Sequence, residues 1–218
     1  MRMSDVGVLG KFYIRRWLGA PPTKTFLDVG SGHRPHADAT HLLDLLPEDD
    51  SERGKPIKRL GRPLILGTVE SLPFKDKTFD YVYASHVLEH TRDPAAACQE
   101  LMRIGRAGYI ETPNPFYEQG YNYPNADRGW SFHRWFVYVG EDDTLVFEPK
   151  TPKTIDEFCE CRHAQFVRNI YKSLGDLNQI HKVLPHECNN TVVRWVDRFN
   201  FEVREAAHLS CSKHVGGR

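Results

Sequence analysis

The chain has 218 residues, with 29 lysines and arginines against 29 aspartates and glutamates, 40% hydrophobic residues and five cysteines. This length is typical of one domain with its own hydrophobic core. The balanced charge argues against a nucleic-acid-binding domain, which is usually strongly basic, and the cysteines are too few for a disulfide scaffold. Charged residues interrupt the N-terminal apolar segment, and no stretch reaches the roughly 18 to 20 apolar residues of a membrane span. We therefore expect a soluble cytoplasmic protein without a membrane segment.

The first half of the chain predicts alternating strands and helices. Apolar residues at helical spacing predict a helix over Ser4–Leu18, which the following glycine and prolines end. Asp93 and Pro94 are typical of a helix start, and Gly105 ends this second helix. Five apolar runs bounded by turn residues predict strands: Thr25–Val29, His41–Asp44, Leu64–Gly67, Phe79–Ser85 and Gly108–Glu111. Strands with long connections favour an α/β fold with parallel pairing.

Beyond residue 115 the pattern predicts a hairpin, a helix and a final pair of strands. The hairpin joins Phe136–Val139 to Thr144–Phe147, the helix is Thr154–Lys172, and the closing pair is Thr191–Val196 with Phe201–Glu205. We expect three parts: an N-terminal helix or lid (1–23), a main domain (24–211) with a substrate-side insertion at 114–190, and a flexible tail (212–218).

A glycine-rich turn follows the first predicted strand. Gly30-Ser31-Gly32 lets the backbone approach a ligand closely, because glycine has no Cβ and adopts positive φ freely. A purely structural tight turn uses the same residues. Pro35 follows closely and the next strand already begins near His41, which leaves little room for the helix that holds a pyrophosphate in dinucleotide-binding folds. The pattern therefore favours a nucleotide-like ligand without a pyrophosphate over NAD.

Asp44 ends the second predicted strand at the same edge of the sheet. A carboxylate there is placed to accept hydrogen bonds from both hydroxyls of an adenosyl ribose. The alternative is an ordinary polar residue of a turn, where aspartate is common.

Three segments carry a resemblance to a known family: residues 26–47, Gly67–Phe74 and Phe79–His90, the last two with Leu-Pro-Phe and Leu-Glu-His signatures. They resemble the class I S-adenosylmethionine (SAM)-dependent methyltransferases, and more narrowly the Methyltransf_11 group. The resemblance covers about residues 24–115. It implies a Rossmann-like, three-layer α/β/α fold whose mostly parallel sheet has an antiparallel closing strand. It also implies SAM as cofactor and S-adenosylhomocysteine as product.

The resemblance assigns the cofactor site residue by residue. Asp28, Gly30, Ser31 and Gly32 correspond to the loop around the methionine part of SAM, and Asp44 to the ribose clamp. Further along, the resemblance places Thr68 and Val69 beside the adenine, and Ser85 and His86 at the sulfonium and the substrate. Thr68 departs from the aspartate that is frequent in the family, and its neutral hydroxyl is a weaker acceptor than a carboxylate.

Methyl transfer from SAM requires an aligned nucleophile more than acid or covalent help, because the sulfonium already carries the leaving group. A base is needed only if the acceptor must lose a proton, and histidine suits that role near neutral pH. His86 and His133 are the candidate catalytic residues, each with a packing role as the alternative. We interpret His90 as structural. The Phe116, Tyr117, Tyr121 and Tyr123 side chains either form an acceptor wall or cover the core.

The later cysteines and histidines raise the question of a metal site. The potential ligands are Cys159, Cys161, His163, His181, His186 and Cys188. Only one residue separates the first two cysteines, and on a helix they point to different faces, which is unlike a structural zinc site. We therefore assign no metal ligand from the sequence.

The leading functional hypothesis is a methyltransferase that acts on a small or medium-sized acceptor and does not bind nucleic acid. The alternative is a non-catalytic SAM-binding or regulatory protein with the same fold, which Thr68 and the short first crossover favour. The sequence defines neither the acceptor nor the oligomeric state.

Overall fold

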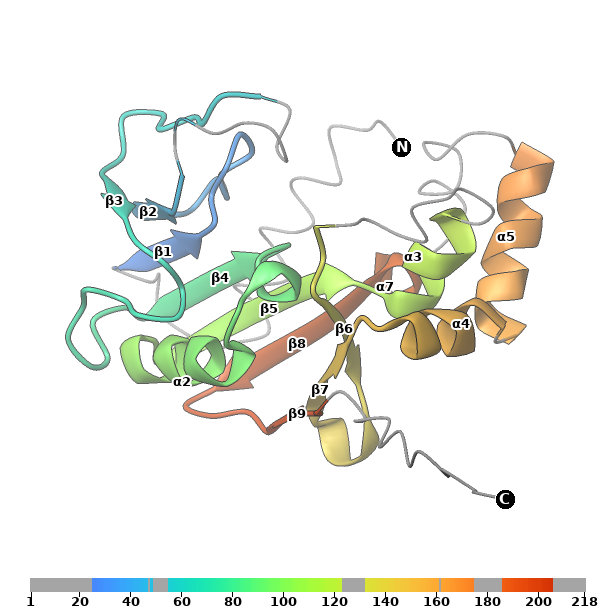
Figure 1. The fold of residues 1–218 in the computed structure, drawn as a ribbon. Helices are drawn as coiled ribbons and strands as arrows, with labels where there is room; N and C mark the ends of the chain where they lie inside the picture. Colours follow the sequence, from blue (N-terminus) through green and yellow to red (C-terminus); the bar gives the residue numbers. More distant parts are fainter. Residues whose placement is uncertain are drawn as a thin grey trace, which may run out of the picture.

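The computed structural model of the chain (Figure 1) describes residues 25–46, 48, 55–122, 132–160, 162–174 and 186–205. The predicted N-terminal helix, the division at residue 23 and the predicted tail lie outside these residues. Among them, no helix combines the length and apolar character that crossing a bilayer requires.

A six-stranded sheet forms the centre of the fold, in the order β3-β2-β1-β4-β5-β8. Its strands are β1 (Phe26–Val29), β2 (His41–Asp44), β3 (Leu64–Leu66), β4 (Tyr81–Ser85), β5 (Ala107–Pro113) and β8 (Asn190–Val196). The first five run parallel, and β8 pairs antiparallel with the whole length of β5. The mostly parallel sheet with an antiparallel closing strand is therefore confirmed.

The strand order reverses between β1 and β4. The chain moves outward from β1 to β2 and β3 and then crosses back to pair β4 with the other side of β1. Open parallel sheets bind their ligands at the carboxyl ends of the strands beside such a reversal. The topology thus directs attention to the loops after β1, β2 and β4.

Alternating side chains of the central strands enter two apolar clusters. Leu27 and Val29 point into the larger cluster with Val82 and Ala84, whereas Phe26 points to the opposite face. Helix α2 (Pro94–Ile104) covers the larger cluster with Ala97, Cys98, Leu101 and Ile104.

The ends of α2 are those that the sequence predicts. Asp93 Oδ1 accepts a hydrogen bond from Ala96 N at 3.0 Å. A Cβ on Gly105 would lie 2.7 Å from Val82 Cγ2 and 2.9 Å from Trp195, so the helix end packs directly on the sheet. The capping residue and the glycine therefore determine both the length of α2 and its close fit to the sheet.

A second sheet has the order β6-β7-β9, with β6 (Trp135–Val139), β7 (Leu145–Pro149) and β9 (Phe201–Val203). The predicted hairpin is confirmed as β6 and β7, which the short 3-10 turn η2 (Glu141–Asp143) connects. The predicted closing pair is wrong, because β8 joins β5 whereas β9 runs parallel to β7. Asp197 has a φ of +59° and redirects the chain between the two sheets.

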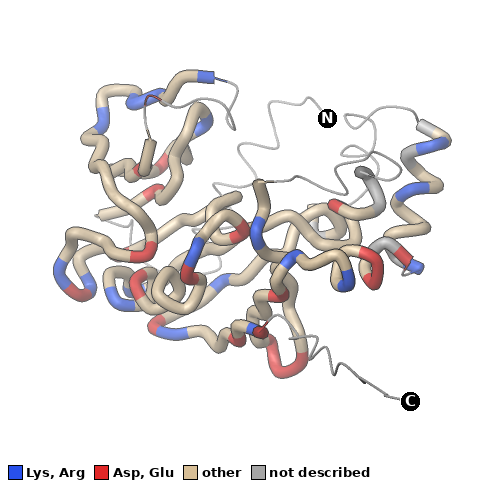
Figure 2. Tube along the Cα trace, viewed as in Figure 1, with Lys and Arg blue, Asp and Glu red and all other residues tan. Residues whose placement is uncertain are grey.

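The remaining helices gather beyond the carboxyl end of β5, on the right of Figure 1. They are α3 (Pro115–Asn122), α4 (Pro152–Glu160), α5 (Arg162–Leu174) and the short α7 (His186–Asn189). The single helix predicted over Thr154–Lys172 is two helices, α4 and α5. Residues of both signs occur along the described trace in Figure 2, with only positive ones in residues 55–62 before β3 and only negative ones in η2.

Candidate active site

The glycine turn after β1 requires glycine at two positions. Gly30 has a φ of +68° and Gly32 a φ of +49°, both in the left-handed region. A Cβ on Gly30 would lie only 2.4 Å from Val87 Cγ2. The backbone N–H groups of Gly30 and Ser31 both donate to Leu43 O, at 2.8 and 3.1 Å. The turn is therefore held tightly against the end of β2.

Asp44 joins this turn to the next loop. Its Oδ2 accepts a hydrogen bond from Gly32 N at 3.0 Å, and its backbone oxygen accepts one from Gly67 N at 3.1 Å. The structure thus brings the glycine turn, Asp44 and the Thr68-Val69 segment together, as the sequence predicts. Val69 is only 6% exposed and packs into the core. The Thr68 hydroxyl lies 3.4 Å from Glu70 N.

Asp28 in β1 and Ser31 in the turn that follows are both buried polar residues. Asp28 Oδ2 accepts a hydrogen bond from His36 N at 2.6 Å. Burial raises the pKa of the Asp28 carboxyl to about 7, although the His36 hydrogen bond and the charge of Arg62 oppose the rise. The Ser31 hydroxyl is buried and has no hydrogen-bond partner among the described residues. A buried hydroxyl without a partner is uncommon in a folded protein and fits a loop that binds a polar ligand.

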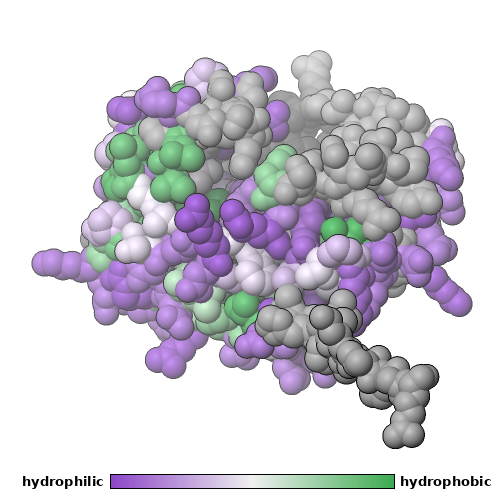
Figure 3. Space-filling view, viewed as in Figure 1, coloured by the Kyte–Doolittle hydropathy of each residue, from purple (hydrophilic) through white to green (hydrophobic). Residues whose placement is uncertain are grey.

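The connection between β1 and β2 contains no helix: residues 30–40 are turns and irregular backbone. This confirms the short crossover expected from the sequence and leaves no helix N-terminus for a pyrophosphate. Directly after Asp44, Leu45 and Leu46 are 56% and 54% exposed, and Leu66 at the end of β3 is 60% exposed. Figure 3 shows apolar atoms gathered over this part of the molecule. An apolar surface beside a carboxylate suits a ligand with a flat apolar face and hydroxyl groups.

His86 lies at the carboxyl end of β4 in a left-handed conformation with a φ of +56°. Its backbone N–H donates to Glu111 O at 2.8 Å, which ties the end of β4 to β5. Its ring contacts two carboxylates, with Nδ1 3.4 Å from Glu89 Oε1 and Nε2 3.3 Å from Glu111 Oε1. Burial works to lower the pKa of His86, but the contacts with the Glu111 and Glu89 carboxylates outweigh burial and raise the pKa to about 10. The half-exposed imidazole is therefore protonated near neutral pH.

Glu111 connects several polar side chains at the end of β5. Its Oε2 accepts hydrogen bonds from Tyr109 Oη and from His186 Nε2, the latter at 2.8 Å, and its Oε1 accepts one from Ser85 Oγ at 3.2 Å. Burial opposes ionisation, but the hydrogen bonds from His186, His86 and Tyr109 hold the pKa of Glu111 below its usual range. The site thus contains a carboxylate flanked by two histidines. The sequence indicated Glu111 only by its position at a strand end, and it did not connect His186 with this strand.

His133, the second candidate catalytic residue, does not contact His86 directly. It is buried, and its Nδ1 lies 3.2 Å from Glu118 Oε2 on α3. The buried Glu89 lies between His86, His90 and His133 and connects the two candidates electrostatically. The sequence indicated no role for Glu89 or Glu118. For Glu89, the available signal was a charged residue directly after the apolar Val87-Leu88 pair.

Two of the aromatic residues considered for an acceptor wall, Phe116 and Tyr117, belong to α3. Tyr117 is 3% exposed, and the Phe116 ring lies 5.5 Å from that of Phe158 on α4. For Tyr117 the structure favours the core alternative, whereas Phe116 is partly buried. The side chain of Tyr121 and all of Tyr123 lie outside the described residues. Of the cysteine and histidine ligands considered for zinc, only His186 and Cys188 have described side chains, and Cys188 is an exposed free thiol.

Residues 27–110, from β1 to β5, match a family model described as a methyltransferase domain. The match contains the glycine turn, Asp44 and His86. This segment is a methyltransferase domain. The domain thus covers the five parallel strands and their loops, whereas the second sheet and α3 to α7 lie after it.

Curated relatives match part of the chain. A demethylmenaquinone methyltransferase of Renibacterium salmoninarum is 33% identical over 119 residues, which are 48% of this chain and 48% of that protein. An uncharacterized methyltransferase of Schizosaccharomyces pombe is 49% identical over 43 residues, which are 20% of this chain and 16% of that protein. The chain therefore spans half or less of the length of these relatives.

Solved structures that match the chain have low TM-scores and low sequence identity. The YcgJ protein from Bacillus subtilis has a TM-score of 0.39 and 13% identity, over 84% of this chain and 92% of that chain. The N-terminal domain of EvdMO1 with S-adenosylhomocysteine bound has a TM-score of 0.36 and 19% identity, over 48% of this chain and 49% of that chain.

Proposed function

We propose that this protein transfers a methyl group from SAM to a small or medium-sized acceptor and releases S-adenosylhomocysteine. The observation that carries the proposal is the hydrogen bond between Gly32 N and Asp44. It joins the left-handed glycine turn, which follows β1 beside the reversal of the sheet, to the carboxylate at the end of β2. The match of residues 27–110 to a methyltransferase domain supports it. The absence of a helix in residues 30–40 argues against a pyrophosphate-containing cofactor.

The residues at this edge suit the parts of SAM. The backbone at Gly30 and Gly32 admits the methionine part, and the buried Ser31 hydroxyl gains a hydrogen-bond partner there. Asp44 accepts from the ribose hydroxyls, while Leu45 offers an apolar surface to the adenine. Bound SAM supplies a methyl group on a cationic sulfur, so the protein needs to align the acceptor rather than activate the donor.

On the acceptor side, His86 acts as a hydrogen-bond donor rather than as a base. Its contacts to Glu89 and Glu111 raise its pKa to about 10, and a protonated imidazole has no lone pair for a proton. Glu111 remains ionised and binds a cationic or hydroxyl group. We infer that His86 and Glu111 orient the acceptor, and that catalysis rests on this alignment.

The test is calorimetric titration of the protein with SAM and with S-adenosylhomocysteine. Asp44→Asn removes the charge of the acceptor and keeps its shape, and we expect a loss of about 10- to 100-fold in affinity because hydrogen bonds to a charged group contribute about 1.5 to 3 kcal/mol. Asp76→Asn is the matched control, since the Asp76 side chain is 78% exposed and pairs with Arg103 away from the site. Absence of binding to the intact protein at millimolar ligand would refute the proposal.

A second candidate is a protein that binds SAM but does not turn it over. Thr68, a neutral residue where the family often has an acidic one, and the protonated His86 favour it. Release of S-adenosylhomocysteine during incubation with SAM and a small-molecule extract separates the two. Turnover that the Asp44→Asn variant loses supports the enzyme, and SAM binding without turnover supports the second candidate.

A further inference from the structure

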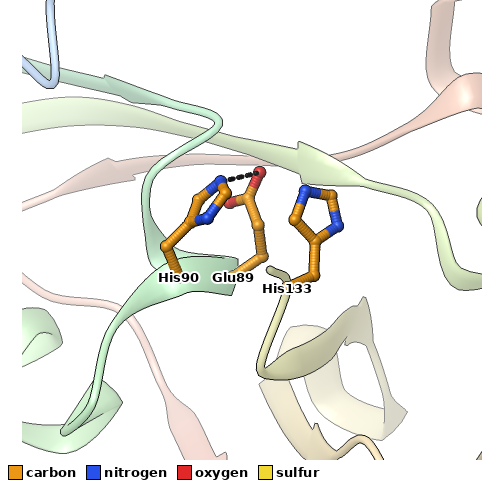
Figure 4. A group of neighbouring side chains, drawn as sticks. All are labelled: Glu89, His90 and His133. Atoms are coloured by element: carbon orange, nitrogen blue, oxygen red, sulfur yellow. Dashed lines mark ion pairs between the residues drawn. The ribbon is translucent and has the colours of Figure 1, made fainter. Parts of the chain in front are cut away.

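Three potential metal ligands meet beside the short 3-10 turn η1 (Leu88–His90), as Figure 4 shows. Glu89 and His90 belong to this turn, and His133 precedes β6. Each offers one ligand atom, and these atoms all lie within 4.8 Å of one another. In the part of the chain that the structure describes, this is the one group of three such side chains found.

Backbone and side-chain hydrogen bonds hold the two segments together. Arg134 N donates to Glu89 O at 2.8 Å, and Trp135 Nε1 donates to Thr91 O at 2.8 Å. The His90 ring packs edge-on against the His133 ring, with centroids 4.8 Å apart. The juxtaposition therefore belongs to the packing of β6 against η1 and does not depend on the orientation of a single side chain.

Glu89 is a buried carboxylate without close hydrogen bonds. The residue is 1% exposed, and neither of its carboxylate oxygens has a hydrogen-bond partner among the described residues. The nitrogens that face it are His86 Nδ1 at 3.4 Å and His90 Nε2 at 3.8 Å, which are ion-pair distances. Buried charges in proteins are paired, hydrogen-bonded or bound to a metal. The Glu89 oxygens can therefore still accept a cation in the cluster.

His133 has the outer contact that is typical of a metal-binding histidine. Its Nδ1 lies 3.2 Å from Glu118 Oε2, and the other oxygen of Glu118 accepts a hydrogen bond from Lys150 Nζ at 2.6 Å. When Nδ1 donates its hydrogen to Glu118, Nε2 carries the lone pair. Histidines that ligate metals usually donate their other N–H to a carboxylate in this way, which sets the tautomer and the ring orientation.

We propose that Glu89, His90 and His133 bind one divalent transition-metal ion. Two imidazoles and a carboxylate are a ligand set for Zn²⁺ and for Mn²⁺ or Fe²⁺. Bonds of about 2.1 Å at tetrahedral angles place ligand atoms about 3.4 Å apart. Because the ligand atoms already lie within 4.8 Å of one another, no pair needs to close by more than about 1.4 Å. Three protein ligands leave a position for water or for an oxygen of a bound molecule.

This site goes beyond the proposed function and does not depend on methyl transfer. It lies next to the candidate active site, because His86 contacts both Glu89 and Glu111. The sequence indicated a structural role for His90 and a catalytic role for His133, and it pointed to no metal ligand. In the structure, these two histidines and Glu89 form one cluster.

The experiment uses the full chain without a polyhistidine tag, treated with a chelator and then titrated with Zn²⁺, Mn²⁺ and Co²⁺ separately. We expect one equivalent of metal by elemental analysis, and visible absorption bands with Co²⁺ that report its protein ligands. Glu89→Gln and His133→Gln are expected to lose at least 10-fold in affinity and to lose the Co²⁺ bands. Circular dichroism verifies that each variant is folded.

His41→Gln is the matched control, because His41 begins β2 at the opposite ends of the parallel strands, away from the cluster. It should bind metal like the unmodified chain. Two results overturn the proposal: a wild-type protein that binds none of the three metals, or folded Glu89→Gln and His133→Gln variants that retain one equivalent with unchanged affinity. SAM titration of the chelator-treated protein is independent of these readouts, so failure of the metal site and failure of the proposed function are distinguishable.

Discussion

The buried carboxyl of Asp28 predicts a pH-dependent stability that one substitution abolishes. Asp28 is 3% exposed, and burial raises its pKa from 3.8 to about 7. Between these values the folded protein keeps a proton that the unfolded chain releases. The stabilisation from this group is therefore complete below about pH 4 and is lost as the pH rises through about 7.

The magnitude follows from the size of the shift. A rise from 3.8 to about 7 is roughly three pKa units, and at about 1.4 kcal/mol per unit it corresponds to about 4 kcal/mol in the free energy of unfolding. The side-chain amide of an Asp28→Asn variant does not ionise, and its oxygen still accepts the hydrogen bond from His36 N. We therefore expect the variant to gain up to about 4 kcal/mol over wild type between pH 4 and pH 8.

Urea denaturation at single-unit pH intervals from 4 to 8 measures this difference. The free energies of wild type and variant are subtracted at each pH, which removes the contributions of all other titrating groups. Asp76→Asn, at a side chain that is 78% exposed, should differ from wild type by a constant amount. A difference between wild type and Asp28→Asn that stays constant within about 1 kcal/mol over the range would refute the reasoning.

Three further predictions concern the loop, the cofactor and the metal. Gly30→Ala should lower the free energy of unfolding by about 2 to 5 kcal/mol, because the alanine has to adopt positive φ and its Cβ clashes with Val87. Urea denaturation measures this difference, and a loss under about 1 kcal/mol contradicts the close packing of Gly30 on Val87. SAM binding at pH 7 should release about half a proton, because a cationic ligand favours ionised Asp28. Calorimetry in buffers of different ionisation enthalpy measures the release, which Asp28→Asn should abolish. Glu118→Gln should weaken metal binding about 10- to 100-fold by replacing the charged acceptor of His133 Nδ1 with a neutral amide oxygen. Unchanged affinity in the Co²⁺ titration would show that the charge of Glu118 does not support this ligand.

Much of the methyltransferase domain was predictable from the sequence, because its signals are local. The apolar runs of β1 and β2 are bounded by turn residues, and Asp93 and Gly105 define the ends of α2. The glycine turn demands positive φ at Gly30 and Gly32, which glycine alone adopts without strain. Because parallel strands end at one edge of a sheet, the meeting of this turn with Asp44 followed from the strand assignments.

The assignments that failed depend on contacts between residues far apart in the chain. The local sequence of β8 and β9 does not show that they belong to different sheets. Their places depend on their partners, because β8 pairs with the edge of β5 and β9 pairs with the edge of β7. In the same way, His133 lies near Glu89 because β6 packs against η1. No local sequence pattern predicts this packing. Spacing along the chain thus determined the strands, the caps and the cofactor loop. Tertiary packing alone decided which buried charges share one environment, because burial and electrostatic interaction depend on distance in space.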